Sequence, residues 1–490
     1  MNKFSDIFLK LKAQIDAFDD VSLVRLIKIF CAAAALVILY AFIFCGFQVV
    51  DEFEHLHASW LVSIGKAPYR EFFEHHNPLL WYLSAPIVSL FYDNVIVFYV
   101  MRGISVAASI VTMRYMYKIV LFFGNRLCGW WAVVLYLGNL ITVYNFYQFR
   151  PDVFMNLCFV AGVYYWFCYL KDKRTINLVY SFLAWTVSTL FLQKISLMLG
   201  IVQVIILWQL LRKQMTVKAA VIATLPSLLV MCAFVGFLVW LAILPEYVEL
   251  NYRFNQAMIY YFERGSFWYQ NLWFGVYGMA FAAAVVLYKK ENTFFKIIAL
   301  LYVAEFLMRA FYFAPHPNYY TLLTILKAMV LGVAVNKLAV KSRLFCITAA
   351  CLMFLNLGAI FNRIDANSER HNSYAHYKLA QFAHNNSASN DLFMNGYDMN
   401  FNVYRYDVHY YWFGLDMLLP IMEQEYGLAQ KLDVNQLILQ YHPKFIYTKD
   451  YVDLWALRKY GEIKYSQQFL PELVKLLYKQ TPFQNLAVLK

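Results

Sequence analysis

The sequence predicts an all-α protein that crosses a membrane many times and ends in a small C-terminal domain of mixed α/β structure. Of its 490 residues, 62% are hydrophobic and only 15% are charged, and the mean hydropathy is +0.50. Such a composition is typical of polytopic membrane proteins. About 11 apolar runs approach or reach the ~20 residues that a helix needs to cross a bilayer. After residue 361 the chain becomes polar and contains no further run of that length.

The first 28 residues are predicted to form an amphipathic segment on the cytoplasmic side. They carry charges of both signs, with Lys or Arg at positions 3, 10, 12, 25 and 28. The apolar run that follows, near residues 29–50, is longer than the core of a cleavable signal peptide. We therefore expect an anchor whose positive flank stays in the cytoplasm.

The transmembrane domain is expected over residues 29–361, with all clusters of Lys and Arg on one side. Clusters such as 171–174 and 289–290 fall on alternate loops, as the positive-inside rule requires. This alternation holds only if residues 78–92 form a helix that lies at the outer surface or is partly re-entrant. It places residues 51–93 and 362–490 outside the cytoplasm. After the first span, the others are expected near residues 95–122, 128–147, 153–170, 176–193, 195–211, 219–244, 271–288, 294–313, 319–337 and 344–361.

The stretch from residue 51 to residue 82 concentrates titratable side chains between apolar segments. It begins with two adjacent carboxylates, Asp51 and Glu52, and contains four histidines among aromatic residues. An acidic pair beside a span is costly in lipid but well placed in a polar cavity at the membrane surface. A carboxylate there could serve as the general base that deprotonates a hydroxyl group. The alternative is that Asp51 caps the short helix that follows.

The order of residues in this stretch resembles the first outer loop of a known enzyme family. The matching segments are Asp51-Glu52-x-x-His55, Gly65-Lys66-x-Pro68-Tyr69-Arg70-Glu71-Phe72-Phe73 and His76-x-Pro78-Leu79. The family comprises bacterial membrane glycosyltransferases related to protein O-mannosyltransferases and to the lipid A aminoarabinose transferase. These are GT-C enzymes that use polyprenyl-phosphate sugars. The resemblance implies that Asp51 is the catalytic acid of the pair. One departure is Asn77, because the family usually has His-Pro-Pro-Leu at this point.

Cationic and polar side chains on the outer side are candidates for binding the substrate, because a departing phosphate needs positively charged donors. Arg102 lies about two turns inside an apolar span, where a charge is costly. Lys194 interrupts another apolar run at a corner that resembles one in the family. The alternatives are snorkelling and internal ion pairs, such as an i,i+4 pair between Glu305 and Arg309. The expected substrate-binding residues are Glu52, His55, Tyr69, Arg70, His76, Arg102, Arg150, Asp152, Lys194, His316, Asn318 and Tyr319.

A metal site is the alternative interpretation of the histidine-rich stretch. No His-Glu-x-x-His or Asp-x-Asp pattern is present, and a monophosphate sugar donor carries less charge than the pyrophosphate donors that favour a metal. We therefore expect no required cofactor, with a divalent metal as the alternative. The side chains concerned are Glu54, His55, His57, Glu74, His75 and His76.

Other partner classes find little support in the sequence. The net charge of +12 agrees with basic cytoplasmic loops, and no nucleic-acid-binding motif accompanies it, so no nucleic acid is expected. The eight cysteines lie in apolar segments without zinc-ligand spacing, which argues against a disulfide framework.

Residues 362–490 are predicted to form the small α/β domain. Short β-like runs near 391–395 and 444–448 alternate with helical patterns near 373–384 and 451–460.

Taken with the resemblance, these features predict an inverting glycosyltransferase of GT-C fold in the bacterial cytoplasmic membrane. It would move a hexose or pentose from a polyprenyl-phosphate carrier to a lipid, glycan or protein acceptor on the outer face. A transporter or lipid-linked sugar flippase is the alternative. Transporters bind substrate near the bilayer midplane, often between repeats, whereas the polar groups here gather at one mouth and no repeat is visible.

Overall fold

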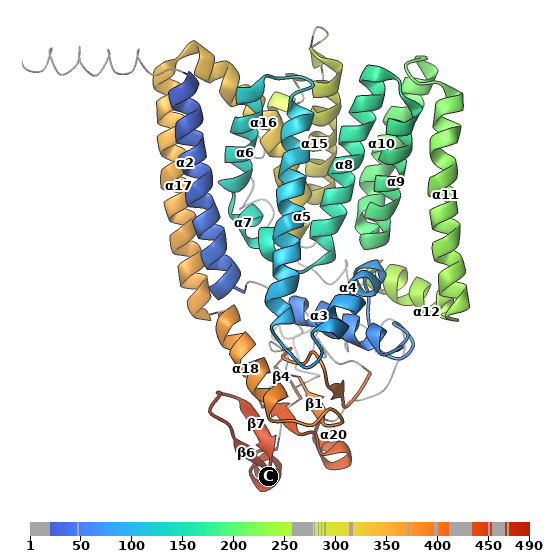
Figure 1. Cartoon of the computed structure of the whole chain (residues 1–490), viewed down its shortest axis with the longest axis vertical. Coiled ribbons are helices and arrows are strands. Elements are labelled where there is room, and N and C mark those ends of the chain that lie inside the picture. The colour runs from blue at the N-terminus through green and yellow to red at the C-terminus, as the bar shows by residue number, and fades with distance from the viewer. Residues whose placement is uncertain are drawn as a thin grey trace, which may run out of the picture. The chain divides into compact units, whose positions relative to one another are not determined.

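Helices dominate the computed structural model, which forms two compact units (Figure 1). The helical unit comprises residues Met1–Cys45, Ile104–Met231 and Phe262–Arg370, and the mixed unit comprises Gly46–Gly103, Cys232–Tyr261 and His371–Lys490. The structure describes residues 20–46, 49–256, 278, 280–282, 284–285, 287–288, 291–312, 317–370, 372–395, 400–410, 434–448, 451–452, 466–467 and 470–490.

The helical unit contains most of the long apolar helices. Its elements are α2 (Asp20–Phe44), most of α5 (Val97–Val120), α6 (Arg126–Leu137), α7 (Leu140–Tyr147), α8 (Pro151–Asp172), α9 (Thr175–Phe191), η1 (Gln193–Ile195), α10 (Ser196–Leu211), most of α11 (Val217–Trp240), α15 (Thr293–Tyr312), η3 (Pro317–Tyr320), α16 (Thr321–Lys341) and α17 (Arg343–Arg370).

The described residues contain seven helices that are long and apolar enough to cross a membrane. The count rises to eight if α6 and α7, which are bent by 80° relative to each other, form one broken span. The described residues therefore do not confirm the predicted number of about 11 spans. Helix α9 has only 17 residues, and α15 carries three charged side chains, at positions 296, 305 and 309. The expected span at 271–288 falls largely outside the described residues.

The first helix differs from its predicted limits. Helix α2 begins at Asp20 and ends at Phe44, instead of covering residues 29–50. A new helix, α3 (Val49–Ser63), then begins, so Asp51 lies within this second helix. The offset has a local cause, because Gly46 follows shortly after the last residue of α2, where glycine commonly ends a helix.

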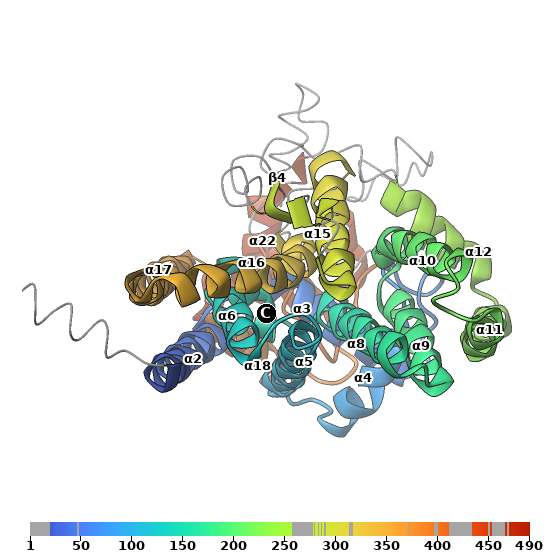
Figure 2. The same ribbon diagram turned by 90° about the horizontal axis from the view of Figure 1, so that it is seen from above.

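Close helix packing holds the helical unit together. Helix α2 runs beside α17, and the Tyr40 hydroxyl donates to Asp365 Oδ1 at 2.5 Å. Seen from above, α16 packs against both α6 and α15 (Figure 2). At Gly332 of α16, an added Cβ would lie 2.7 Å from the backbone nitrogen of Ala132 in α6. Only glycine therefore permits this approach of the two backbones.

The mixed unit combines short helices with a small sheet. Its helices are α3, α4 (Leu79–Leu90), α12 (Leu244–Val248), η2 (Glu249–Phe254), α18 (Ser373–Asn385), α20 (Val434–Tyr441) and α22 (Pro471–Leu477). Helix α4 has 12 residues, or about 18 Å, which is too short to cross a ~30 Å hydrocarbon core. This length agrees with the expectation that residues 78–92 do not form a full span.

The C-terminal part of the mixed unit contains a five-stranded sheet in the order β2-β1-β3-β7-β6. Strand β1 pairs in parallel with β2 and β3, and β7 pairs antiparallel with β3 and β6. A core that includes Met394, Ile446 and Ala487 packs between the sheet and α20. The predicted mixed α/β structure is therefore confirmed. The strands are β1 (Leu392–Met394), β2 (Tyr406–Asp407), β3 (Phe445–Tyr447), β4 (Tyr451–Val452), β5 (Ser466–Gln467), β6 (Tyr478–Gln480) and β7 (Leu486–Leu489).

The helix predicted near 451–460 is wrong at its start, because Tyr451 and Val452 pair antiparallel with β5. Tyr451 and Val452 are residue types that favour strands, and local helical periodicity does not register a partner strand. The rest of that predicted helix lies outside the described residues.

Candidate functional site

The two adjacent carboxylates at the start of α3, Asp51 and Glu52, lie in different environments. Glu52 is fully buried, and its two carboxylate oxygens accept from Arg102 Nε at 2.9 Å and Nη2 at 2.5 Å. Arg102 is also fully buried, lies 4.3 Å from the ring centre of Phe98 and donates from Nη1 to Ser373 Oγ at 3.2 Å. Both of these predicted substrate-binding side chains thus belong to an ion pair inside the mixed unit.

Asp51 occupies a different environment from Glu52. It is half-buried, in the first turn of α3, where a carboxylate interacts favourably with the helix dipole. Adjacent side chains on a helix point about 100° apart, so the burial of Glu52 does not require that of Asp51. The structure therefore separates a buried, paired carboxylate from a more accessible one.

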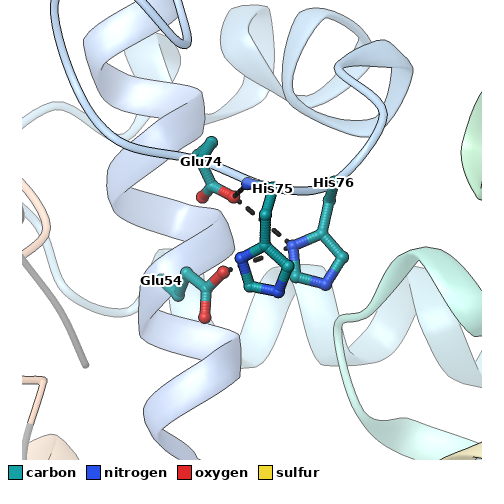
Figure 3. Close-up of side chains that lie close together, drawn as sticks. All are labelled: Glu54, Glu74, His75 and His76. Carbon is teal, nitrogen blue, oxygen red and sulfur yellow. Dashed lines mark hydrogen bonds and ion pairs between the residues drawn. The ribbon is translucent and has the colours of Figure 1, made fainter. Parts of the chain in front are cut away.

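Two carboxyl groups and two imidazole rings meet one turn further along α3 (Figure 3). Glu54 comes from α3, and Glu74, His75 and His76 come from the loop before α4. His76 Nδ1 lies 3.4 Å from Glu54 Oε1 and 3.4 Å from Glu74 Oε2. One ligand atom from each of these four side chains lies within 4.8 Å of the others. We call these four residues the Glu-His cluster.

Burial determines the protonation of the Glu-His cluster. Burial raises the pKa of the Glu54 carboxyl well above its ordinary value, although a hydrogen bond with Glu74 opposes the shift. Burial and the nearby charge of Glu54 raise the pKa of Glu74 to about 8, against the opposing effect of His76. Burial also lowers the pKa of His75 well below its ordinary value. Without a bound cation, the two carboxyl groups therefore hold protons near neutral pH and His75 is uncharged.

Neighbouring polar side chains fix the backbone of the loop that carries the cluster. The Tyr69 hydroxyl donates to the His76 carbonyl at 2.6 Å, and Asn255 Nδ2 donates to the His75 carbonyl at 2.6 Å. The Tyr247 hydroxyl donates to Asn77 Oδ1 at 2.9 Å. Asn77 thus supplies an acceptor that the proline usual in the resembled family lacks. Sequence reasoning noted this departure without finding its partner, which lies 170 residues away.

The other predicted residues of this region also have partners within the mixed unit. Tyr69 is buried with a left-handed φ of 68°, and His55 Nδ1 accepts from Trp81 Nε1 at 3.2 Å. Arg70 Nη1 donates to the Leu241 carbonyl at 3.0 Å. His57 forms a buried pair that the sequence did not suggest, with its Nε2 3.0 Å from Asp407 Oδ2. Of the predicted residues in this unit, His76 belongs to the Glu-His cluster, and the His55 ring centre lies 5.0 Å from that of His76.

A second cluster of charged side chains lies in the helical unit. Asp152, in the first turn of α8, pairs with Lys194 and lies 3.6 Å from Arg150 Nε. The Lys194 ammonium lies 4.1 Å from the ring centre of Tyr319. We call this group, together with Glu305 and Arg309, the cationic cluster. Glu305 and Arg309 form the i,i+4 pair considered above, with Arg309 Nε 2.6 Å from Glu305 Oε1.

The cationic cluster is buried and brings three cationic side chains together. The side chains of its paired residues are 13% exposed or less. Arg309 lies close enough to Lys194 and Tyr319 to act on them electrostatically. The named side chains comprise three cations, Arg150, Lys194 and Arg309, and two carboxylates, Asp152 and Glu305. Of the remaining predicted residues, His316 and the side chain of Asn318 lie outside the described part of the chain.

The described chain combines long apolar helices, two short helices after α2 and a C-terminal α/β part. This combination is that of the GT-C fold. Among solved structures, two of ArnT from Cupriavidus metallidurans share this fold. The structure bound to undecaprenyl phosphate has a TM-score of 0.55 at 12% identity, covering 81% of this chain and 87% of that one. The apo structure has a TM-score of 0.54 at 11% identity, covering 78% and 84%.

The GT-C fold predicted from the first outer loop is therefore confirmed. No protein-family model and no curated protein sequence matches the chain.

Proposed function

We propose that this protein is an inverting glycosyltransferase that moves a hexose or pentose from a polyprenyl-phosphate carrier to a lipid, glycan or protein acceptor. The observation that carries the proposal is the buried cationic cluster at the start of α8, where three cationic side chains gather. The shared fold supports it, since ArnT has been solved with undecaprenyl phosphate bound.

The sign of the charge in the cluster suits the proposed donor. Cationic side chains within membrane-spanning helices are costly and are usually functional. A phosphodiester is an anion and would be attracted to the three cations that gather here. Arg150 and Lys194 would contact the phosphate, and the N-terminal end of α8 adds the positive end of a helix dipole.

Asp51 is the proposed general base. It takes the proton of the acceptor hydroxyl while that oxygen bonds to the anomeric carbon of the sugar. The bond from this carbon to the phosphate oxygen breaks on the opposite face, which inverts the configuration, and the electron pair leaves with the phosphate. Proton transfer of this kind contributes roughly 10²- to 10⁴-fold to the rate. No step needs a metal, because side-chain cations stabilise the leaving group.

We place this reaction at the outer face of the bacterial cytoplasmic membrane, with the N-terminal segment in the cytoplasm and the C-terminal domain outside. The support is the distribution of Lys and Arg over alternate loops of the sequence.

The test is carrier binding by the purified full-length protein, measured by native mass spectrometry with undecaprenyl phosphate. Lys194→Gln should weaken binding by about ten- to a hundredfold, the range expected for a charge-assisted hydrogen bond of ~1.5–3 kcal/mol. Lys218→Gln is the matched control, because Lys218 is exposed. This variant should bind the carrier as tightly as the wild type does. Equal binding by Lys194→Gln and the wild type would remove this cluster from the carrier site.

The transporter alternative is tested in proteoliposomes that contain a lipid-linked sugar and candidate acceptors. A transferase releases free carrier phosphate and forms a glycosylated acceptor. Movement of the intact lipid-linked sugar to the other leaflet, with no glycosylated product, would instead identify a flippase.

A further inference from the structure

We infer that the Glu-His cluster of Glu54, Glu74, His75 and His76 is a structural zinc site that fastens α3 to the loop before α4. The inference goes beyond the proposed sugar transfer, which uses neither these four side chains nor a metal.

The ligand types and charges fit a divalent transition metal. Imidazole nitrogen and carboxylate oxygen are ordinary zinc ligands, whereas Mg²⁺ and Ca²⁺ favour sites made of oxygen alone. Two ionised carboxylates and two neutral imidazoles around one Zn²⁺ make a unit with no net charge. A neutral unit can remain buried at low cost, whereas two adjacent ionised carboxylates cannot. Four protein ligands with no open position are typical of structural zinc sites.

The distances also agree with tetrahedral coordination. With zinc–ligand bonds of 2.0–2.1 Å, two ligands of a tetrahedron lie ~3.3 Å apart. His76 Nδ1 lies 3.4 Å from an oxygen of Glu54 and 3.4 Å from an oxygen of Glu74. The remaining separations among the four ligand atoms do not exceed 4.8 Å. Shifts of about an ångström or less in the side chains would therefore close the coordination shell.

A second observation points to a missing partner inside the cluster. Glu74 is completely buried, and its Oε1 has no hydrogen-bond partner among the described residues. Figure 3 shows the carboxyl groups of Glu54 and Glu74 turned toward the rings of His75 and His76. Buried carboxylate oxygens normally have a partner, and a cation at this point would supply one.

The surrounding hydrogen bonds hold the ligands in place. Tyr69 and Asn255 fix the carbonyl groups of His76 and His75, as expected for the outer shell of a metal site. The metal would thereby join α3 to a loop that lies some 20 residues further along the chain. Asp51 lies three residues before Glu54 on α3, so the same ion would steady the helix that carries the proposed base.

The test is metal analysis of the full-length protein purified without chelators. Inductively coupled plasma mass spectrometry should find one zinc ion per chain in the wild type and only background zinc in Glu54→Gln and His76→Gln. The matched control is Glu71→Gln, whose carboxylate lies on the same loop but binds the Lys66 ammonium and the Ala67 amide. It should keep its zinc. Replacement by Co²⁺ should give the intense visible absorption of tetrahedral cobalt, which the two ligand variants should lack.

Zinc should also increase the hydrogen-exchange protection of α3 in the wild type. The inference is wrong if the wild type holds no metal after zinc loading, or if both ligand variants keep a full equivalent. Carrier binding through Lys194 is measured in a separate experiment. An absence of zinc would therefore leave the proposed function intact. Conversely, zinc binding would not support the proposed function if Lys194→Gln bound the carrier as the wild type does.

Discussion

Removing the charge of Glu52 tests whether Glu52 has a structural role while its neighbour Asp51 has the chemical one. In Glu52→Gln the guanidinium of Arg102 stays completely buried while it loses the carboxylate that accepts its two hydrogen bonds. Removing one partner of a buried ion pair costs about 3–5 kcal/mol, because an uncompensated charge remains inside the protein. Arg102 also contacts α18 through Ser373, so the loss should reach beyond α3.

Amide hydrogen exchange on peptides from α3 and α18 measures this loss directly. A cost of 3–5 kcal/mol lowers protection by roughly 10²- to several 10³-fold wherever exchange requires this pair to open. The double variant Glu52→Leu/Arg102→Met removes both charges and should recover most of the protection, since apolar replacements of buried pairs are often neutral or stabilising.

Two results would refute the structural role of Glu52. One is unchanged protection in Glu52→Gln, and the other is a double variant as poorly protected as the single one. Sugar transfer by the double variant adds a functional answer. If Glu52 only supports α3, activity returns with protection, whereas a folded but inactive double variant would assign Glu52 to substrate binding.

Two further predictions concern the proposed base and the C-terminal domain. Asp51→Asn should lower sugar transfer by at least ~10²-fold with carrier binding retained; near wild-type turnover would exclude Asp51 as the base. Burial lowers the pKa of His384 to about 4. The neutral ring is required here, because its Nε2 accepts from the amides of Val403 and Tyr404. The neutral ring stabilises the fold fully above pH ~6.5, and up to ~3 kcal/mol is lost as the pH falls toward 4. Hydrogen exchange at residues 403–404 should show this loss, and His384→Gln should abolish its pH dependence.

The sequence predicted the fold well wherever a local property decides the structure. Apolar runs locate α8, α10 and α17 because burial in lipid depends on each residue's own side chain. Helix α2 exceeded its predicted start because backbone hydrogen bonds continue through charged residues such as Arg25 and Lys28. Hydropathy marks the apolar part of a helix and gives no signal for its polar extension. The early end of α2 left a weak signal in Gly46, which the hydropathy pattern outweighed.

The candidate sites depend on pairing between distant residues, which local patterns do not contain. Spacing drew attention to Asp51, Glu52 and Lys194, but their partners could not be predicted. Glu52 pairs with a residue 50 positions away, and Asp152 pairs with one 42 positions away. Arg102 and Lys194 looked alike in the sequence, as single charges in apolar runs. The structure distinguishes them, since Arg102 forms a bidentate pair with Glu52, whereas Lys194 shares Asp152 with Arg150.

This difference gives a physical criterion for choosing among buried charges. Glu52 with Arg102 and Glu305 with Arg309 are pairs of opposite charge, in which each buried carboxylate lies against a guanidinium. In the cationic cluster three cations gather around two carboxylates, whereas ionising both carboxyl groups of the Glu-His cluster would place two negative charges side by side. A low-dielectric interior penalises like charges that lie close together. The sign of the gathered charge then indicates the ligand, an anionic phosphate at the start of α8 and a metal cation between α3 and the loop before α4.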